Sequence, residues 1–293
     1  MGTLAYDFGF EPAAPAKGKD MTERVTEIPE LTTLELETDG RIGTLTLNRP
    51  ESLNAMSPGM IDELEVVFGW LADQPLRALI VTGAGGAFCA GGDVNWFKKG
   101  IEDPEIDIVA SVKRGADVLH EAIAGVRALP CPVIAAINGP AAGAGFSLAL
   151  ACDLRICSDE AILACAYGRI GASPDGGMTY FLPRVVGPSR AIEILLNDPN
   201  LSAEAALDEK LVTEVVAADD LLGRAREKAE KLAAMSPHYV RMARKLAGSS
   251  LDHELMEHLD IERDAIARAM ATEDLHNAVN AFLSGGEVEF TGN

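Results

Sequence analysis

The stretch that decides the fold is ALPCPVIAAINGPAAGAGFSLALAC, at residues 128–152. It contains no charged residue and is long enough to span a bilayer, but prolines and glycines interrupt it repeatedly, and a single spanning helix tolerates them poorly. A short buried strand over 132–137, a glycine-rich loop and a buried helix over 144–151 explain the pattern better. The stretch therefore predicts the interior of a globular protein, with no insertion into a membrane.

Strand-like and helical patterns alternate on both sides of this stretch. The dipeptide Asp39-Gly40 separates the first two strand patterns and is typical of a hairpin turn. Ser57 followed by Pro58 is a typical helix start, and apolar residues recur at helical spacing behind it as far as Leu71. The alternation indicates an α/β domain. Strands are expected over 33–37, 41–48, 77–82 and 154–157, and a further long helix over 115–128.

The pattern changes after Leu201, where we expect helices alone. Residues 1–31, by contrast, are rich in Ala, Pro, Glu and Thr without periodicity, which is typical of a mobile arm. We therefore divide the chain into an arm over 1–31, a core over 32–215 and a helical region over 216–293. Two apolar stripes at helical spacing mark the last region, one with Leu221, Leu222, Ala225, Ala229 and Leu232, the other with Leu255, Leu259, Ile266 and Met270.

The amino-acid composition excludes several classes of function. Of the 293 residues, 48% are hydrophobic and 24% are charged, so we expect a packed core rather than disorder. The 45 acidic and 25 basic residues give a net charge of −20, which argues against binding to nucleic acid or to an anionic membrane. The five cysteines show no metal-binding spacing, and the start of the chain lacks a signal-peptide pattern. These features predict reduced thiols, no metal site and a cytoplasmic location.

Two glycine-rich loops, at residues 83–93 and 138–145, each lie between an expected buried strand and an expected helix. Neither completes the glycine pattern of a dinucleotide-binding loop, and no Gly-Lys-Ser/Thr follows for a phosphate loop. Ser147 is close to the pattern of a hydrolase nucleophile, but it falls inside the helix rather than on a sharp turn after a strand. Both loops do present backbone N–H groups. Two such groups that donate to one carbonyl oxygen form an oxyanion hole. Its stabilising effect is greatest on an enolate, where negative charge accumulates on that oxygen.

A set of short motifs extends this interpretation. The chain contains, in order, Leu47-Asn-Arg-Pro50, Leu53-Asn-Ala-Met56, Phe88-Cys-Ala-Gly-Gly-Asp93, Pro132-Val-Ile-Ala-Ala-Ile-Asn-Gly139, Leu148 with Cys152-Asp153, and Leu182-Pro-Arg-Val-Val-Gly187. In order and spacing these motifs resemble the crotonase (enoyl-CoA hydratase/isomerase) superfamily, over roughly residues 32–285. The resemblance implies an α/β fold built as a spiral of ββα units, a helical region that assembles trimers, and thioesters of coenzyme A as substrates.

The resemblance also implies an oxyanion hole made by the backbone N–H groups of Gly92 and Ala144. The family usually has glycine at the second position, but alanine keeps the N–H and is acceptable if the residue has helical dihedrals. Coenzyme A is part of the substrate, so no separate cofactor is implied. The expected partners are the acyl-CoA thioester and further copies of the chain, in a trimer or a dimer of trimers. The residues expected to contact the substrate or its coenzyme A are Arg49, Leu53, Ala90, Asp93, Val94, Gly143 and Tyr167.

The acid and base residues depart from the hydratase pattern. Hydratases of the family activate a water with two glutamates, and those two positions hold Ser147 and Tyr167 here. Neither can act as a carboxylate base. Asp175, in Ser173-Pro-Asp-Gly-Gly177, instead resembles the single catalytic aspartate of family isomerases, and the ring-opening isomerases of phenylacetyl-CoA catabolism have a closely similar stretch. Without the resemblance, an aspartate before two glycines is a common turn signal.

The sequence thus predicts an acyl-CoA enzyme that shifts a double bond, or opens a ring epoxide, through a thioester enolate with Asp175 as acid and base. Three alternatives stay open. They are an enoyl-CoA hydratase of fatty-acid β-oxidation, covalent attack by Asp175 as in some family dehalogenases, and a non-catalytic acyl-CoA binder. Asp93 is alternatively a helix cap, and Asp153 is expected to make a structural hydrogen bond. Trp96 and Phe97 are expected in the acyl pocket or in the core.

Overall fold

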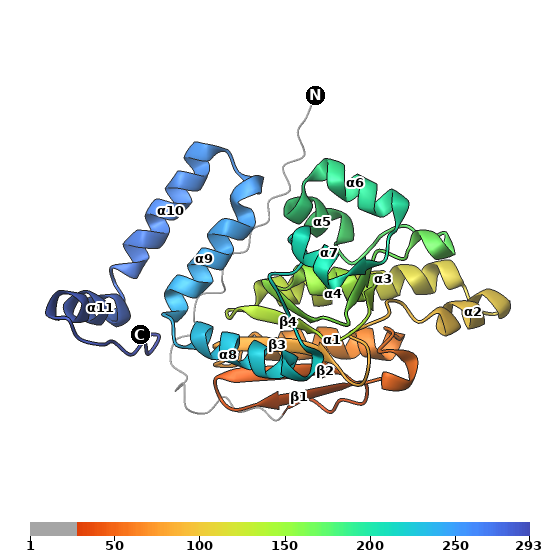
Figure 1. Ribbon diagram of the computed structural model, residues 1–293, viewed down its shortest axis with the longest axis horizontal. Coiled ribbons are helices and arrows are strands. Elements are labelled where there is room, and N and C mark those ends of the chain that lie inside the picture. Colours follow the sequence, from red (N-terminus) through yellow and green to blue (C-terminus); the bar gives the residue numbers. More distant parts are fainter. Residues whose placement is uncertain (1–27) are drawn as a thin grey trace.

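Residues 28–293, which the computed structural model describes, form a six-stranded sheet with helices on both faces, and a smaller three-stranded sheet (Figure 1). The predicted arm over 1–31 falls largely outside the described residues. In the large sheet only the first pair of strands is antiparallel. Its strands, in spatial order, are β1 (Leu34–Thr38), β2 (Ile42–Leu47), β3 (Ala78–Gly83), β4 (Val133–Ile137), β6 (Leu154–Ser158) and β9 (Glu214–Val216). The small sheet joins β5 (Ala141–Ala142), β7 (Ile162–Ala164) and β8 (Leu201–Ser202).

The helices confirm the predicted α/β class and the helical C-terminal region. One helix differs clearly from its prediction: α3 starts well before residue 115, because the Asp107 carboxylate caps it by accepting a hydrogen bond from the Ala110 N–H at 3.0 Å. The helices are α1 (Pro58–Leu71), α2 (Val94–Glu102), α3 (Ile108–Ala128), α4 (Ala144–Ala151), α5 (Met178–Val186), α6 (Pro188–Asn197), α7 (Ala203–Asp208), α8 (Leu221–Ala233), α9 (Pro237–Ser249), α10 (Leu255–Ala269) and α11 (Glu273–Ser284).

Alternate residues of the strands build two apolar cores, one on each face of the large sheet. In β3, Leu79 and Val81 join the core formed with α1, α3 and α4. The intervening Ala78 and Ile80 join the core formed with α8. All four side chains are buried, which confirms that the apolar run in 77–82 is a strand covered on both faces.

The expectation of helices alone after Leu201 is wrong, because two short strands there pair with strands formed earlier in the chain. β8 pairs with β7, and β9 forms the edge of the large sheet beside β6. α8 then packs across the second face of that sheet through Ala225 and Ala229. The α/β core therefore extends beyond the boundary predicted at residue 215. Leu222, placed in the apolar stripe of this helix, is 52% exposed, and Ala233 packs into the core instead.

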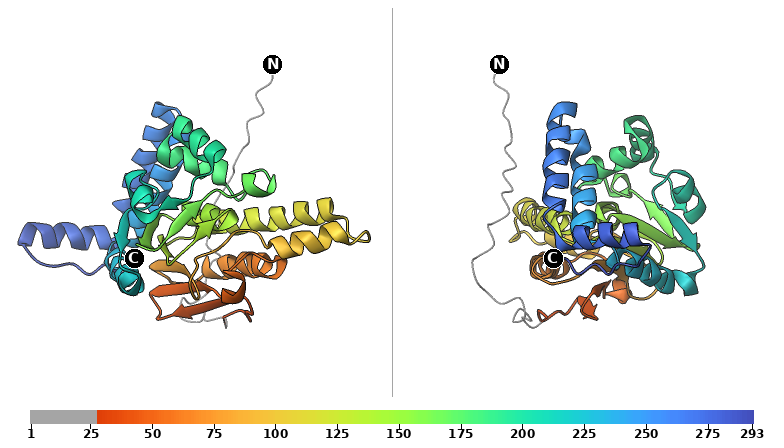
Figure 2. Two further views of the ribbon diagram at one scale, coloured as in Figure 1. Left: turned by 45° about the vertical axis from the view of Figure 1, so that its right-hand side comes forward. Right: turned by 90° about the vertical axis from the view of Figure 1, so that its left-hand side faces the viewer.

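Of the last helices, α9 lies against the α/β body, α10 contacts α9, and α11 projects from the body in the left view of Figure 2. Asp153 ties α9 to the sheet, since its carboxylate accepts from the Arg244 side chain at 2.7 Å and from the Val133 N–H at 2.8 Å. The structural hydrogen bond predicted for Asp153 is thus confirmed. Large apolar side chains of α10 and α11, such as Leu255 and Phe282, are exposed. Within the described residues, no helix combines the length and the apolar character needed to cross a membrane.

Candidate active site

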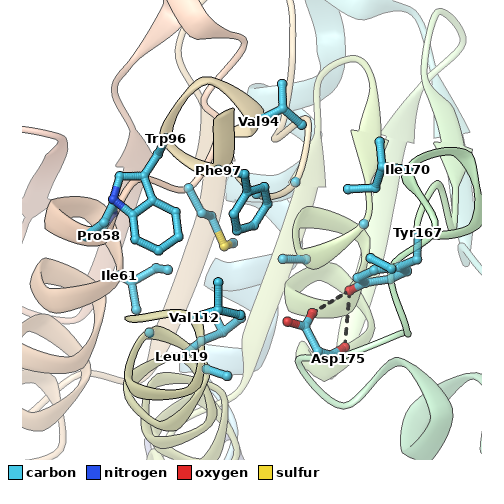
Figure 3. Close-up of a pocket in the computed structure, with 18 of the residues that line it drawn as sticks. Pro58, Ile61, Val94, Trp96, Phe97, Val112, Leu119, Tyr167, Ile170 and Asp175 are labelled. Carbon is cyan, nitrogen blue, oxygen red and sulfur yellow. Dashed lines mark hydrogen bonds between the residues drawn. The ribbon is translucent and has the colours of Figure 1, made fainter. Parts of the chain in front are cut away.

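A pocket of about 900 Å³ opens where helices α1, α2 and α3 face the start of α4 and the segment that carries Tyr167 and Asp175 (Figure 3). Much of its wall is apolar, with Ile61 from α1, Phe97 from α2 and Leu119 from α3. Both glycine-rich loops contribute backbone to it. The pocket therefore joins a wide apolar region to the polar groups that the sequence singles out.

The two glycine-rich loops lie directly against each other beside this pocket. The Cys89 N–H donates to the Pro140 carbonyl at 3.1 Å, and the Cys89 carbonyl accepts from the Ala142 N–H at 2.9 Å. Gly91 has a φ of 97°, and a Cβ there would lie 2.9 Å from the carbonyl oxygen of Ala142. Glycine is therefore required at this crossing, both for the backbone conformation and for the close approach. These contacts hold the two loops at a fixed separation.

The N–H groups of Gly92 and Ala144, which the sequence predicts as an oxyanion hole, both lie in the pocket wall. Neither of them donates to any group within residues 28–293. Ala144 is the first residue of α4, where an N–H has no acceptor inside the helix, and Gly143 turns the chain into that helix with a φ of 51°. The helical conformation expected of Ala144 is confirmed. Because α4 is buried, its positive N-terminal end favours negative charge at this point of the pocket.

Asp175 reaches the pocket on a tight glycine turn. Gly176 and Gly177 both have positive φ values, of 58° and 83°, and the Asp175 carbonyl accepts from the Met178 N–H as α5 begins. A Cβ on Gly176 would lie 3.1 Å from the Cβ of Ser147, so the turn also packs closely on α4. The turn signal and the functional interpretation of Asp175 are therefore compatible, because the turn is what positions its half-buried carboxylate.

Ser147, Tyr167 and Asp175 form one hydrogen-bonded group. The Tyr167 hydroxyl donates to Oδ1 of Asp175 at 2.8 Å and lies 3.0 Å from Oγ of Ser147, which itself donates to the Asp175 carbonyl at 3.0 Å. Burial, and then the charge of Asp175, raise the pKa of the Tyr167 phenol above its ordinary value, so the phenol stays a donor. Oδ2 of Asp175 has no hydrogen-bond partner among the described residues, and Figure 3 shows this carboxylate oxygen turned toward the pocket.

The structure brings most of the predicted substrate contacts together and leaves three of them aside. Arg49, Leu53 and Asp93 do not line the pocket. The Arg49 guanidinium forms an ion pair with Asp93 at 3.1 Å, and the Asp93 carboxylate also caps α2, accepting from the Asn95 N–H at 3.0 Å. The capping interpretation of Asp93 is thus confirmed, while a contact of Arg49 or Leu53 with coenzyme A stays a prediction. The predicted residues that do line the pocket are Gly92, Ala144, Asp175, Ala90, Val94, Gly143 and Tyr167.

Sequence reasoning missed the contribution of α3, whose first half lines the pocket. Val112 and Leu119 supply apolar surface there, and Arg114 supplies an exposed cation that forms no ion pair within residues 28–293. The signal that points to this helix is its cap at Asp107, which lies well before the apolar pattern begins. Trp96 and Phe97, expected in the pocket or the core, do line the pocket, with ring centroids 5.3 Å apart.

The cysteines and possible metal ligands lie outside this chemistry. All five cysteines are unpaired and buried, and burial raises the pKa of the Cys89 thiol to about 12, which keeps it protonated and unreactive. Within the described part of the chain, no three His, Cys, Asp or Glu side chains are arranged to hold a metal ion. No cysteine lines the pocket either, so thiols add nothing to the groups that face it.

Comparison with known proteins agrees with this geometry. A family model described as enoyl-CoA hydratase/isomerase matches residues 37–293. The 1,2-epoxyphenylacetyl-CoA isomerase of Escherichia coli (strain K12) is 38% identical over 250 residues, which cover 85% of this chain and 94% of the relative. The short-chain-enoyl-CoA hydratase of Clostridium acetobutylicum is 31% identical over 262 residues, covering 89% and 98%. The solved structure of an enoyl-CoA hydratase from Bacillus anthracis is 30% identical with a TM-score of 0.82, covers 89% of this chain and 100% of that chain, and confirms the crotonase-like fold. The chain therefore belongs to the enoyl-CoA hydratase/isomerase family.

Proposed function

We propose that this enzyme moves a double bond in an acyl-CoA thioester from the β,γ to the α,β position, through an enolate. Gly92 and Ala144 would hold the enolate oxygen, and Asp175 would act as acid and base. The observation that carries the proposal is that Asp175 supplies one half-buried carboxylate to the pocket that the two backbone donors also line. Asp62 also belongs to the pocket wall, but it lies on the exposed face of α1.

The proposed reaction needs one proton to leave and one to return. Oδ2 of Asp175 takes a proton from the carbon α to the thioester, and the electron pair moves onto the carbonyl oxygen between the two N–H groups. The protonated carboxyl then returns the proton to the γ carbon, and the double bond re-forms between the α and β carbons. Tyr167 holds Oδ1, so the carboxylate keeps one orientation in both steps. The similarity to the E. coli relative extends the proposed substrates to acyl groups with a ring epoxide.

Addition of water to a 2-enoyl-CoA is the second candidate function, because some relatives are named as hydratases. A hydratase of this type orients and activates its water with two carboxylates. Here the two corresponding side chains are the Ser147 hydroxyl and the Tyr167 phenol, which bond to each other and to Asp175. Neither is a base near neutral pH. The geometry therefore favours proton transfer within the substrate over addition of water.

Two parallel assays test the proposal. In the first, a 3-enoyl-CoA is supplied and the conjugated 2-enoyl-CoA is followed by its absorbance. In the second, a 2-enoyl-CoA is supplied and 3-hydroxyacyl-CoA is measured. We expect turnover in the first assay, its loss in Asp175→Asn, and little product in the second. Hydration without isomerisation would identify a hydratase, and tight binding without turnover of either thioester would identify an acyl-CoA binder; either result overturns the proposal.

A further inference from the structure

We propose that Gly115 of α3 sets the width of the acyl pocket, and that the missing side chain there makes room for an acyl group that carries a ring. This inference rests on the proposed function for its substrate, an acyl-CoA thioester. It depends on the shape of the pocket and not on the identity of the base.

Gly115 has no packing reason to be a glycine. A Cβ placed on it would meet no atom within 4 Å, and its φ is not positive, so alanine fits without strain. Gly125 in the same helix differs, because its Cβ would lie 2.9 Å from the Cβ of Phe68 and a side chain there would collide with α1. A glycine in the middle of a helix lowers the stability of the folded protein relative to alanine. At Gly115 nothing in the helix packing offsets that cost.

The empty volume at Gly115 belongs to the pocket. Gly115 lines it, and so does Ala116, between the larger Val112 one turn before and Leu119 one turn after. The middle of this helix face is therefore recessed, while both ends carry bulky side chains. By comparison, Gly69 of α1 also meets no atom within 4 Å, but it lies on the exposed surface and not in the pocket wall.

Aromatic and aliphatic side chains complete the wall around the same cavity. Trp96 and Phe97 come from α2, and Ile61 comes from α1; in Figure 3 these side chains and Val112 surround the space beside Leu119. Because bulky side chains bound the recess at both ends, it makes the pocket wider at one place and does not lengthen it. A straight acyl chain gains little contact in such a recess. A ring fills it, and stacking on aromatic side chains strengthens its binding further.

Binding of non-reactive thioesters tests this inference separately from the chemistry. Dissociation constants are measured by calorimetry for butyryl-CoA, octanoyl-CoA and phenylacetyl-CoA. The first two have saturated acyl chains, and the double bonds of the third belong to an aromatic ring, so none of them is isomerised. Octanoyl-CoA has as many acyl carbons as phenylacetyl-CoA, so the pair separates length from width. The proteins are the wild type, Gly115→Ala, Gly115→Leu and the surface control Gly69→Leu. Thermal unfolding shows that each variant is folded.

The wild type is expected to bind phenylacetyl-CoA more tightly than butyryl-CoA. Gly115→Leu should raise the dissociation constant of phenylacetyl-CoA at least about tenfold, which is the usual effect of overfilling a fitted pocket. It should change that of butyryl-CoA by less than about twofold, because the thioester contacts remain. Gly115→Ala should fall between, and Gly69→Leu should match the wild type. Equal weakening for octanoyl-CoA and phenylacetyl-CoA, or no weakening in Gly115→Leu, overturns the inference. Neither result bears on whether Asp175 is the base.

Discussion

Replacing Asp175 by asparagine keeps the size and polarity of the side chain and removes the base. A positioned general base contributes about two to four orders of magnitude to a rate, so kcat for isomerisation should fall by about that factor. Binding of a saturated acyl-CoA should change little, because the N–H groups of Gly92 and Ala144 are untouched. The loss is therefore expected in kcat and not in the dissociation constant.

Tyr167→Phe supplies the matched comparison, because it removes the 2.8 Å hydrogen bond to Oδ1 of Asp175 and leaves the carboxylate in place. A hydrogen bond to a charged group contributes about 1.5–3 kcal/mol. Part of that stabilises the carboxylate before it takes the proton and so opposes the reaction, and the rest keeps the group oriented. We expect a loss of about tenfold in kcat. In the Asp175→Asn background the phenol has no charged acceptor, so the same substitution should then cost about threefold or less.

The assay is the appearance of the conjugated thioester from a 3-enoyl-CoA, with kcat and KM measured for the wild type, the two single variants and the double variant. Ser147→Ala is a further control, because its hydroxyl contacts Tyr167 and the Asp175 carbonyl but not the carboxylate. The reasoning is refuted if Asp175→Asn isomerises at a near-normal rate while Tyr167→Phe abolishes turnover. The base would then have to be sought elsewhere in the pocket.

Three further predictions concern the contact between the loops, the pH dependence of stability and the assembly of the chain. Gly145→Ala should lower both the melting temperature and the turnover, because its Cβ would lie 2.6 Å from the Cβ of Cys89 and force the two loops apart; a variant with wild-type values of both would contradict the loop contact. Burial raises the pKa of the Cys89 and Cys152 thiols from 9.0 to about 12, so the unfolded chain releases these protons first. The stability contribution of the buried neutral thiols is therefore fully present below about pH 9. Above that pH the free energy of unfolding should fall by about 1.4 kcal/mol per pH unit for each such thiol, which urea unfolding at pH 8.5 to 10.5 measures. Cys89→Ala should reduce this fall by the contribution of one thiol. Light scattering should detect a trimer or a dimer of trimers, and Phe282→Glu, at an 87% exposed position, should shift it toward monomer with the α/β core still folded; a wild-type monomer at micromolar concentration would count against the predicted assembly.

Much of the fold could be predicted from local sequence, because the signals that specify it act within a few residues. The uncharged run of residues 132–151 predicts a buried strand, a glycine loop and a buried helix, and the structure has β4, β5 and α4 there. The glycines of the two loops also indicate that backbone N–H groups are exposed there, since a close approach of backbone to ligand requires them, and the family resemblance then singles out Gly92 and Ala144 as the donors. β9 was missed because a strand of three half-buried residues has no pattern of its own and depends on β6 for its hydrogen bonds.

By itself the sequence determined the class of fold and the order of the buried strands and helices as far as α4, and its motifs, through their resemblance to a family, predicted which residues form an oxyanion hole and a base. Only the tertiary structure decided how these groups meet. It joins Ser147, Tyr167 and Asp175 through hydrogen bonds between a helix, a loop and a turn, and it pairs Arg49 with Asp93 outside the pocket. It also turns Gly115 of α3 toward the cavity. These arrangements depend on contacts between residues far apart in the chain, which the packing of the sheet and its helices creates and local preferences cannot specify.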